Sequence, residues 1–144
     1  MGFFAFERRW LAVILPAYAG ASEGLVVAEG EVDWLGAADA MLARSHPQAR
    51  LGMHLATWVV WFAPGFLGGG ASTLGAMAPE ARGEFLSKML GDARLGVRGM
   101  ALMLKLTACM AMFKSAAVRG RSGYDLSETR FSKRALPVVS TGAP

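Results

Sequence analysis

This 144-residue sequence lacks the residues and patterns that mark several protein classes. It has a single cysteine, Cys109, which excludes an internal disulfide and any cysteine-ligated cluster held by this chain alone. We expect Cys109 to be a small apolar core residue. Period-two alternation of apolar and polar residues is nearly absent, so the sequence predicts few or no strands. The remaining candidates are helical folds.

Residues that commonly carry chemistry are also scarce. The two histidines, His46 and His54, are eight positions apart with a proline between them, which does not match the spacing of a helical metal site. No serine has a credible histidine and acid companion, and the glycine-rich "GFLGGGAS" lacks the lysine of a phosphate-binding loop. We therefore expect no catalytic, cofactor-binding or metal residues and no independent enzyme. One alternative stays open, which is haem or quinone binding through His54.

Apolar residues, by contrast, are abundant. They make up 53% of the chain, above the 45 to 50% or so of ordinary soluble domains. A single domain of this size has difficulty hiding that much apolar surface, so lipid or a partner protein is expected to cover part of it. The net charge is +4, but no nucleic-acid-binding motif accompanies it. Much of this excess lies in a basic C-terminal tail.

The periodicity predicts an all-α fold, a single small bundle of about five helices over residues 1–125, followed by an extended tail over 126–144. The first helix should bury a stripe of residues three to four positions apart: Phe3, Phe6, Trp10, Val13 and Ala17. Its paired arginines and small residues also outline a secretory or twin-arginine signal, which fits less well because Glu7 and Pro16 interrupt that outline. A second helix should cover residues 31–45, with Glu31 and Asp33 in its first turn.

The third predicted helix begins at Pro47 and carries the strongest membrane signal, because no charged residue lies between Arg50 and Glu80. Pro64 and Gly65 should end it after about 13 apolar residues, or roughly 20 Å, against a hydrocarbon core of about 30 Å. It is therefore expected to be a core helix or an interfacial segment. A fourth helix should begin at Pro79, and Gly91 should separate it from a last long helix over residues 93–118.

That last helix contains "ALMLKLTACMAMF". Its heptad spacing predicts a basic stripe of Arg98, Lys105 and Arg119 on one side. The opposite side is predicted to be the core face, made of Leu102, Leu106, Cys109 and Phe113. The methionines beside this face suit an adaptable contact surface, or they simply fill the core.

The order of these motifs resembles a known family, the small subunit of gluconate 2-dehydrogenase-type flavoprotein complexes, together with the related helical segment of some long-chain alcohol oxidases. The similarity is carried by "FERRWLAVILPAYAG", by "EVDWLGAADAMLARSHPQAR" and by the half from residue 77 to residue 125. In that half, family positions are matched by Pro79, Glu80, Arg82, Phe85, Leu86, Gly123, Tyr124 and Asp125. The sequence departs from the family in lacking a convincing twin-arginine signal.

The resemblance implies a non-catalytic accessory subunit. The FAD and the substrate would belong to a larger partner of the glucose–methanol–choline type, a dehydrogenase of alcohols, sugars or sterol-like compounds. We expect the partner interface to comprise Met100, Met103, Leu104, Met110, Phe113, Tyr124, Asp125, Arg130 and Phe131.

The location expected from these features is the cytoplasm or the cytoplasmic face of the membrane, with the periplasm reached only on an exported partner. The alternative hypothesis is a small membrane-embedded or membrane-surface subunit of an electron-transfer complex. In it, Trp58, Trp61 and Phe62 would lie at the bilayer interface.

Overall fold

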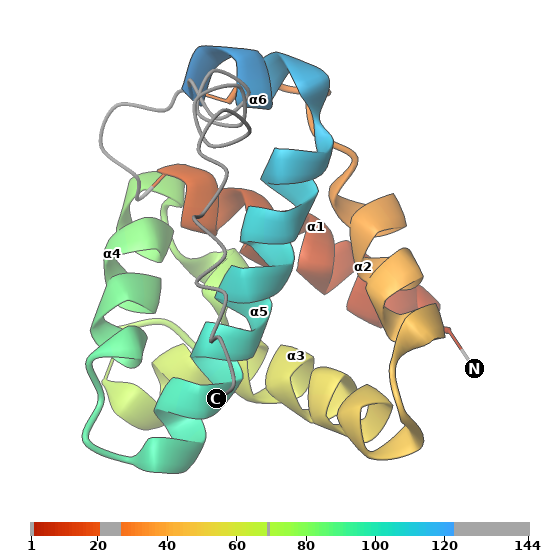
Figure 1. The fold of residues 1–144 in the computed structure, drawn as a ribbon. Helices are drawn as coiled ribbons and strands as arrows, with labels where there is room; N and C mark the ends of the chain where they lie inside the picture. Colours follow the sequence, from red (N-terminus) through yellow and green to blue (C-terminus); the bar gives the residue numbers. More distant parts are fainter. Residues whose placement is uncertain (1, 21–26, 69, 123–144) are drawn as a thin grey trace, which may run out of the picture.

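The computed structural model of the chain describes residues 2–20, 27–68 and 70–122, and these residues form a helical bundle without strands (Figure 1). Its elements in chain order are α1 (Ala5–Gly20), α2 (Trp34–Arg44), α3 (Pro47–Leu67), the short 3₁₀ helix η1 (Leu74–Ala76), α4 (Pro79–Leu90), α5 (Leu95–Lys114) and α6 (Ala116–Ser122). The predicted all-α fold is confirmed. The predicted last helix is divided at Ser115, which separates α5 from α6.

The central element is α5. It packs against α1, α2, α3 and α4, and Figure 1 shows it standing between α2 and α4 with α1 behind it. Three of its buried residues are alanines, Ala101, Ala108 and Ala111. Small side chains at helix contacts allow short interaxial distances, so α5 can be surrounded closely by four neighbours.

Local chemistry explains where the helices begin and end. Pro47 and Pro79 each occupy the first turn of a helix, where a missing N–H breaks no hydrogen bond. Asp33 caps α2 by accepting a hydrogen bond from the Gly36 N–H at 2.8 Å. Glu31 was predicted in the same first turn, but it lies before the helix and accepts a bond from the Ala28 N–H.

The end of α3 differs from the prediction. The helix passes through Pro64 and Gly65 and ends at Leu67. The residue that stops it is Gly68, whose φ of 75° places it in the left-handed conformation that commonly terminates helices. Pro64 is tolerated one turn before this end, where it is buried.

The buried stripe predicted for the first helix is only partly correct: Phe3, just before α1, is buried and Ala17 is half-buried against the core. The residues that face the core are Glu7, Leu11, Ile14, Leu15, Tyr18 and Ala19. Phe6 is 39% exposed, and Trp10 and Val13 are only half-buried. Leu11 and Leu15 lie in the main core with Tyr18, so Phe6 and Trp10 are left at the edge of the bundle.

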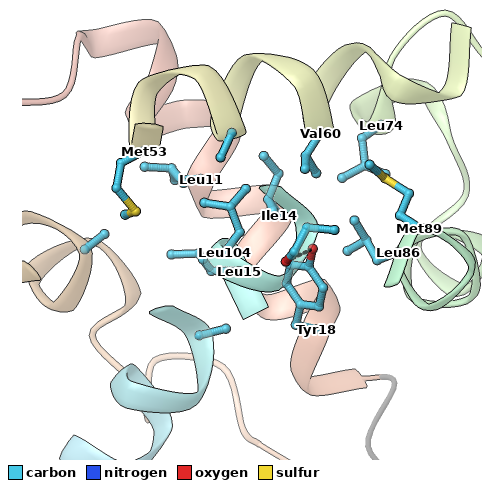
Figure 2. Close-up of a cluster of buried hydrophobic side chains, with 14 of the residues drawn as sticks. Leu11, Ile14, Leu15, Tyr18, Met53, Val60, Leu74, Leu86, Met89 and Leu104 are labelled. Carbon is cyan, nitrogen blue, oxygen red and sulfur yellow. Dashed lines mark hydrogen bonds between the residues drawn. The ribbon is translucent and has the colours of Figure 1, made fainter. Parts of the chain in front are cut away.

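One main core joins α1, α2, α3, η1, α4 and α5, and Figure 2 shows part of it. Its labelled aliphatic side chains are Leu11, Ile14, Leu15, Met53, Val60, Leu74, Leu86, Met89 and Leu104. Burying a side chain of this size contributes about 1.5 to 3 kcal/mol. Tyr18 adds a polar link, because its hydroxyl donates to the Ala101 carbonyl oxygen at 2.9 Å. Cys109 is half-buried against a smaller cluster beside α6.

Candidate interaction surfaces

The outward side of α5 is apolar. Its exposed large side chains are Leu95, Leu102, Leu106, Met110 and Phe113. These positions recur at spacings that place them on one side of a helix. Leu95 and Met110 are the most exposed, at 73% and 59%. We call this surface the α5 face.

The α5 face reverses the predicted orientation of this helix. Leu102, Leu106 and Phe113 were predicted to form the core side, yet all three are exposed. The buried residues are instead Ala101, Leu104, Thr107, Ala108, Ala111 and Met112. Both sides of α5 are apolar, and the four neighbouring helices contact the side that carries the alanines.

The predicted basic stripe is only partly continuous. Arg98 and Lys105 are exposed beside the α5 face, as their positions on the helix require. Arg119 lies beyond the break at Ser115, on α6, and donates to the Phe113 carbonyl oxygen at 3.1 Å. Arg94 precedes the helix and bonds Asp92, which lowers the pKa of Asp92 to about 2.

The predicted interface residues fall into four groups. Met110 and Phe113 are exposed, so their contact with a partner stays a prediction. Met100 and Met103 are half-buried and pack against the main core. Leu104 is fully buried, and its assignment to the interface is wrong. The other four predicted positions, Tyr124, Asp125, Arg130 and Phe131, lie outside the described residues.

A groove between α2 and α5 adjoins the α5 face. It has a volume of about 640 Å³, and its lining comprises Ala37, Ala40, Met41, Arg44, Ser45, Met110, Phe113 and Lys114. The small side chains of Ala37 and Ala40 leave the groove open, and Met41, Met110 and Phe113 form its apolar walls. Arg44 and Lys114 are exposed, and neither has a hydrogen-bond or ion-pair partner within the described part of the chain. An apolar partner segment with acidic neighbours would complement this groove.

A second apolar surface joins the start of α1 to α3. Its exposed side chains are Phe4, Phe6, Leu51, Leu55, Trp58 and Phe66, and we call it the aromatic face. Its rings contact one another and the half-buried rings beneath them. Phe6 lies 5.0 Å from Trp10, and Trp10 lies 5.2 Å from both Trp58 and Trp61, as measured between ring centroids. From the sequence, Trp58, Trp61 and Phe62 were predicted at a bilayer interface, whereas Phe6 and Trp10 were predicted in the buried stripe of the first helix.

A buried carboxylate holds this second surface together. Glu7 is fully buried and accepts hydrogen bonds from the Phe4 N–H at 2.9 Å, from His54 Nδ1 at 2.8 Å and from Trp58 Nε1 at 3.0 Å. The Phe4 N–H and the Trp58 N–H can only donate, so the Glu7 oxygens accept both, and the Nδ1–H tautomer of His54 would supply the third donor. The sequence predicted no carboxylate near His54, because this partner lies 47 positions away.

The helix α5 is long enough to span a membrane. Among the described helices it alone is long and apolar enough to cross a bilayer, and 33% of its most apolar stretch is buried in the bundle. The core helix of a soluble protein meets the same criterion. A spanning α5 would also carry Arg98 and Lys105 into lipid, at about 2.5 to 3.5 kcal/mol each. The length and composition of α5 are therefore weak evidence that it spans a membrane.

The chemistry of the described surface is the basis for assigning a role to this chain. No family model, curated protein or solved structure matches this chain. Within the described residues, no group of three or more histidine, cysteine, aspartate or glutamate side chains could hold a metal ion. The strongest features on the described surface are the α5 face, with its adjoining groove, and the aromatic face.

Proposed function

We propose that this chain is a non-catalytic helical subunit that binds and stabilises a larger flavin-dependent oxidoreductase of the glucose–methanol–choline type. The observation that carries the proposal is the α5 face, an apolar surface on the central helix of the bundle. A partner bound there would contact α5, which in turn packs against α1, α2, α3 and α4. Binding of a partner would therefore stabilise the folds of both proteins.

The composition of this surface supports a protein partner. Methionine, aromatic residues and arginine are enriched in protein interfaces. The α5 face and its surroundings supply Met110, Phe113 and Arg98, and the adjoining groove adds the unpaired Arg44 and Lys114. Such a mixture offers apolar contact at the centre and charged donors at the rim.

The resemblance supports the identity of the partner. The matched positions Pro79, Glu80, Arg82, Phe85 and Leu86 lie on α4, beside α5. In this proposal FAD, substrate and electron acceptor belong to the partner, which oxidises an alcohol, a sugar or a sterol-like compound. The complex would reside in the cytoplasm or at the cytoplasmic face of the membrane, and would reach the periplasm only on an exported partner.

Co-purification from the native cells tests the proposal. We expect the tagged chain to retain a protein several times its size that carries the absorbance bands of an oxidised flavin. The variant Leu102→Ser with Leu106→Ser should weaken this retention by about tenfold or more, because two central apolar contacts are lost. The matched control, Leu51→Ser with Phe66→Ser on the aromatic face, should retain the flavoprotein.

Three results would contradict the proposal. One is a stable partner without flavin, another is flavin bound to the isolated chain, and the third is equal retention by the α5 variant and the wild type. Circular dichroism of each variant establishes that it is folded before its retention is interpreted.

A further inference from the structure

We infer that the aromatic face is a docking surface for a lipid bilayer and holds this chain flat against the membrane. The inference concerns α1 and α3 and does not depend on the identity of the partner at α5. It rests on three properties of the aromatic face: the lack of hydrogen-bonding groups, the sign of the surrounding charge and the alignment of the exposed side chains.

The first property is the chemistry of the exposed atoms. Every exposed residue of α3 from Leu51 to Phe66 is leucine, tryptophan, phenylalanine or glycine. Trp58 is the only one of these with a polar side-chain atom, and its N–H is already bonded to Glu7 at 3.0 Å. The ring of Trp58 can therefore enter hydrocarbon without leaving an unsatisfied donor.

The lack of free hydrogen-bonding groups favours lipid over protein as the binding partner of the aromatic face. Protein interfaces carry about one hydrogen bond per 100 to 200 Å². The exposed side chains of α3 between Leu51 and Phe66 offer no free group to make such bonds. The α5 face, in contrast, is bordered by Arg98 and Lys105. Of the two apolar surfaces, the aromatic face is the one suited to acyl chains.

The second property is charge. The one acidic residue of α1, Glu7, is buried, and α3 has no acidic residue. Arg9 is exposed on α1 and has no hydrogen-bond or ion-pair partner within the described ranges. A free guanidinium beside an apolar surface suits the phosphate level of a membrane, where arginine side chains reach from the hydrocarbon to the headgroups.

The third property is geometry. Leu51, Leu55, Trp58 and Phe66 recur along one side of α3 over a length of about 22 Å, at 1.5 Å per residue. The other side of α3 is buried in the main core, through Met53, Ala56, Val60 and Ala63. The helix therefore cannot cross the bilayer and remain folded in the bundle. Interfacial helices lie in the membrane plane with their apolar side about 5 to 10 Å deep.

The aromatic face is also rigid before it meets lipid. The bonds from Glu7 to Phe4, His54 and Trp58 fix the start of α1 on α3. Phe6 contacts Trp58 edge to face, with 5.5 Å between ring centroids. A preorganised surface loses little conformational entropy on binding, which favours affinity.

Flotation of the full-length chain with vesicles tests the inference. We expect the wild type to float with vesicles of phosphatidylcholine and phosphatidylglycerol, and high salt to weaken but not abolish binding, because salt screens charges and leaves apolar insertion intact. Leu51→Ser with Phe66→Ser should reduce vesicle affinity by about tenfold or more. Leu102→Ser with Leu106→Ser, a pair of exposed leucines on α5, should float like the wild type. Brominated acyl chains should quench tryptophan fluorescence, and Trp58→Phe should reduce that quenching.

Several outcomes would overturn the inference. It fails if the wild type does not float, if the α3 variant floats as well as the wild type, or if the α5 variant is the one that is lost. Complete release by high salt would assign the binding to surface cations and not to the aromatic face. Retention of the flavoprotein is measured separately, so failure of vesicle binding and failure of the proposed function are distinguishable.

Discussion

At the scale of single residues, Glu7 shows how one side chain can organise a surface. A glutamate in the first turn of a helix ordinarily remains in water and interacts with the helix dipole. Here the carboxylate is fully buried and satisfies three donors, one of which belongs to its own chain segment and two to α3. By bonding to Phe4 and to two side chains of α3, this carboxylate holds the start of α1 against α3. The exposed aromatic rings of the two segments therefore lie in contact with one another.

Replacement of Glu7 tests this role. We expect Glu7→Ala to lower the free energy of unfolding by about 2 to 4 kcal/mol, because it removes a buried side chain and the acceptor shared by Phe4, His54 and Trp58. Glu7→Gln keeps the shape and one acceptor oxygen and should cost less. Urea denaturation measures both. As a control, Glu84→Ala removes an exposed ion pair with Lys88 and should change stability by no more than about 0.5 kcal/mol. Equal effects at the two positions would show that Glu7 is not a structural centre.

At the scale of the elements, α5 illustrates a helix whose sequence is apolar on both sides. The heptad spacing correctly placed Leu102, Leu106 and Phe113 on one side of the helix. It wrongly predicted that this side faces the core. The bundle buries the other side, where alanines allow four helices to approach closely. Composition could not reveal this choice, because leucine is as apolar on an exposed side as on a buried one.

Alanine substitution at two leucines of α5 measures its orientation. Leu104 is fully buried, so Leu104→Ala should lower the free energy of unfolding by about 2 to 5 kcal/mol through lost burial and a cavity. Leu106 is 52% exposed, and Leu106→Ala should change stability by about 0.5 kcal/mol or less. Both values come from urea denaturation of the isolated chain. A larger loss at Leu106 than at Leu104 would contradict the orientation described here.

At the scale of the whole molecule, the buried hydroxyl of Tyr18 couples global stability to pH. Burial raises the pKa of Tyr18 well above its ordinary value of about 10. Above pH 10 or so, the unfolded chain loses this proton while the folded chain keeps it. The unfolded state then binds fewer protons, so stability falls as pH rises, by about 1.4 kcal/mol per pH unit from this group.

The variant Tyr18→Phe isolates this effect. It should cost about 1 kcal/mol at neutral pH, since the hydrogen bond to Ala101 is lost, and it should remove the alkaline decline that belongs to Tyr18. Urea denaturation from pH 8 to 11 or so gives both slopes. Near-ultraviolet absorbance of tyrosinate provides the direct check. If the wild type and the variant lose stability equally at high pH, Tyr18 does not control this dependence.

Residues 2–20, 27–68 and 70–122 present two apolar surfaces of different chemistry. One is bordered by cations and a groove, and the other lacks free hydrogen-bonding side chains. The sequence indicated excess apolar surface from its composition and placed tryptophans at a possible membrane interface. It did not connect Phe4 with His54 or Phe6 with Trp58, because these rings meet only when the start of α1 packs on α3.

The sequence by itself determined the helices and most of their limits, because these depend on neighbours in the chain. Pro47, Pro79 and Asp33 act within one turn, and the near absence of alternating patterns excluded a sheet. The tertiary structure decided which side of each helix is buried and which distant groups meet, as with Glu7 and His54. The physical reason is that a helix with apolar residues on several sides can be buried in several ways. Only the combined packing of all its neighbours selects one of them, and that selection also decides which apolar surface remains exposed.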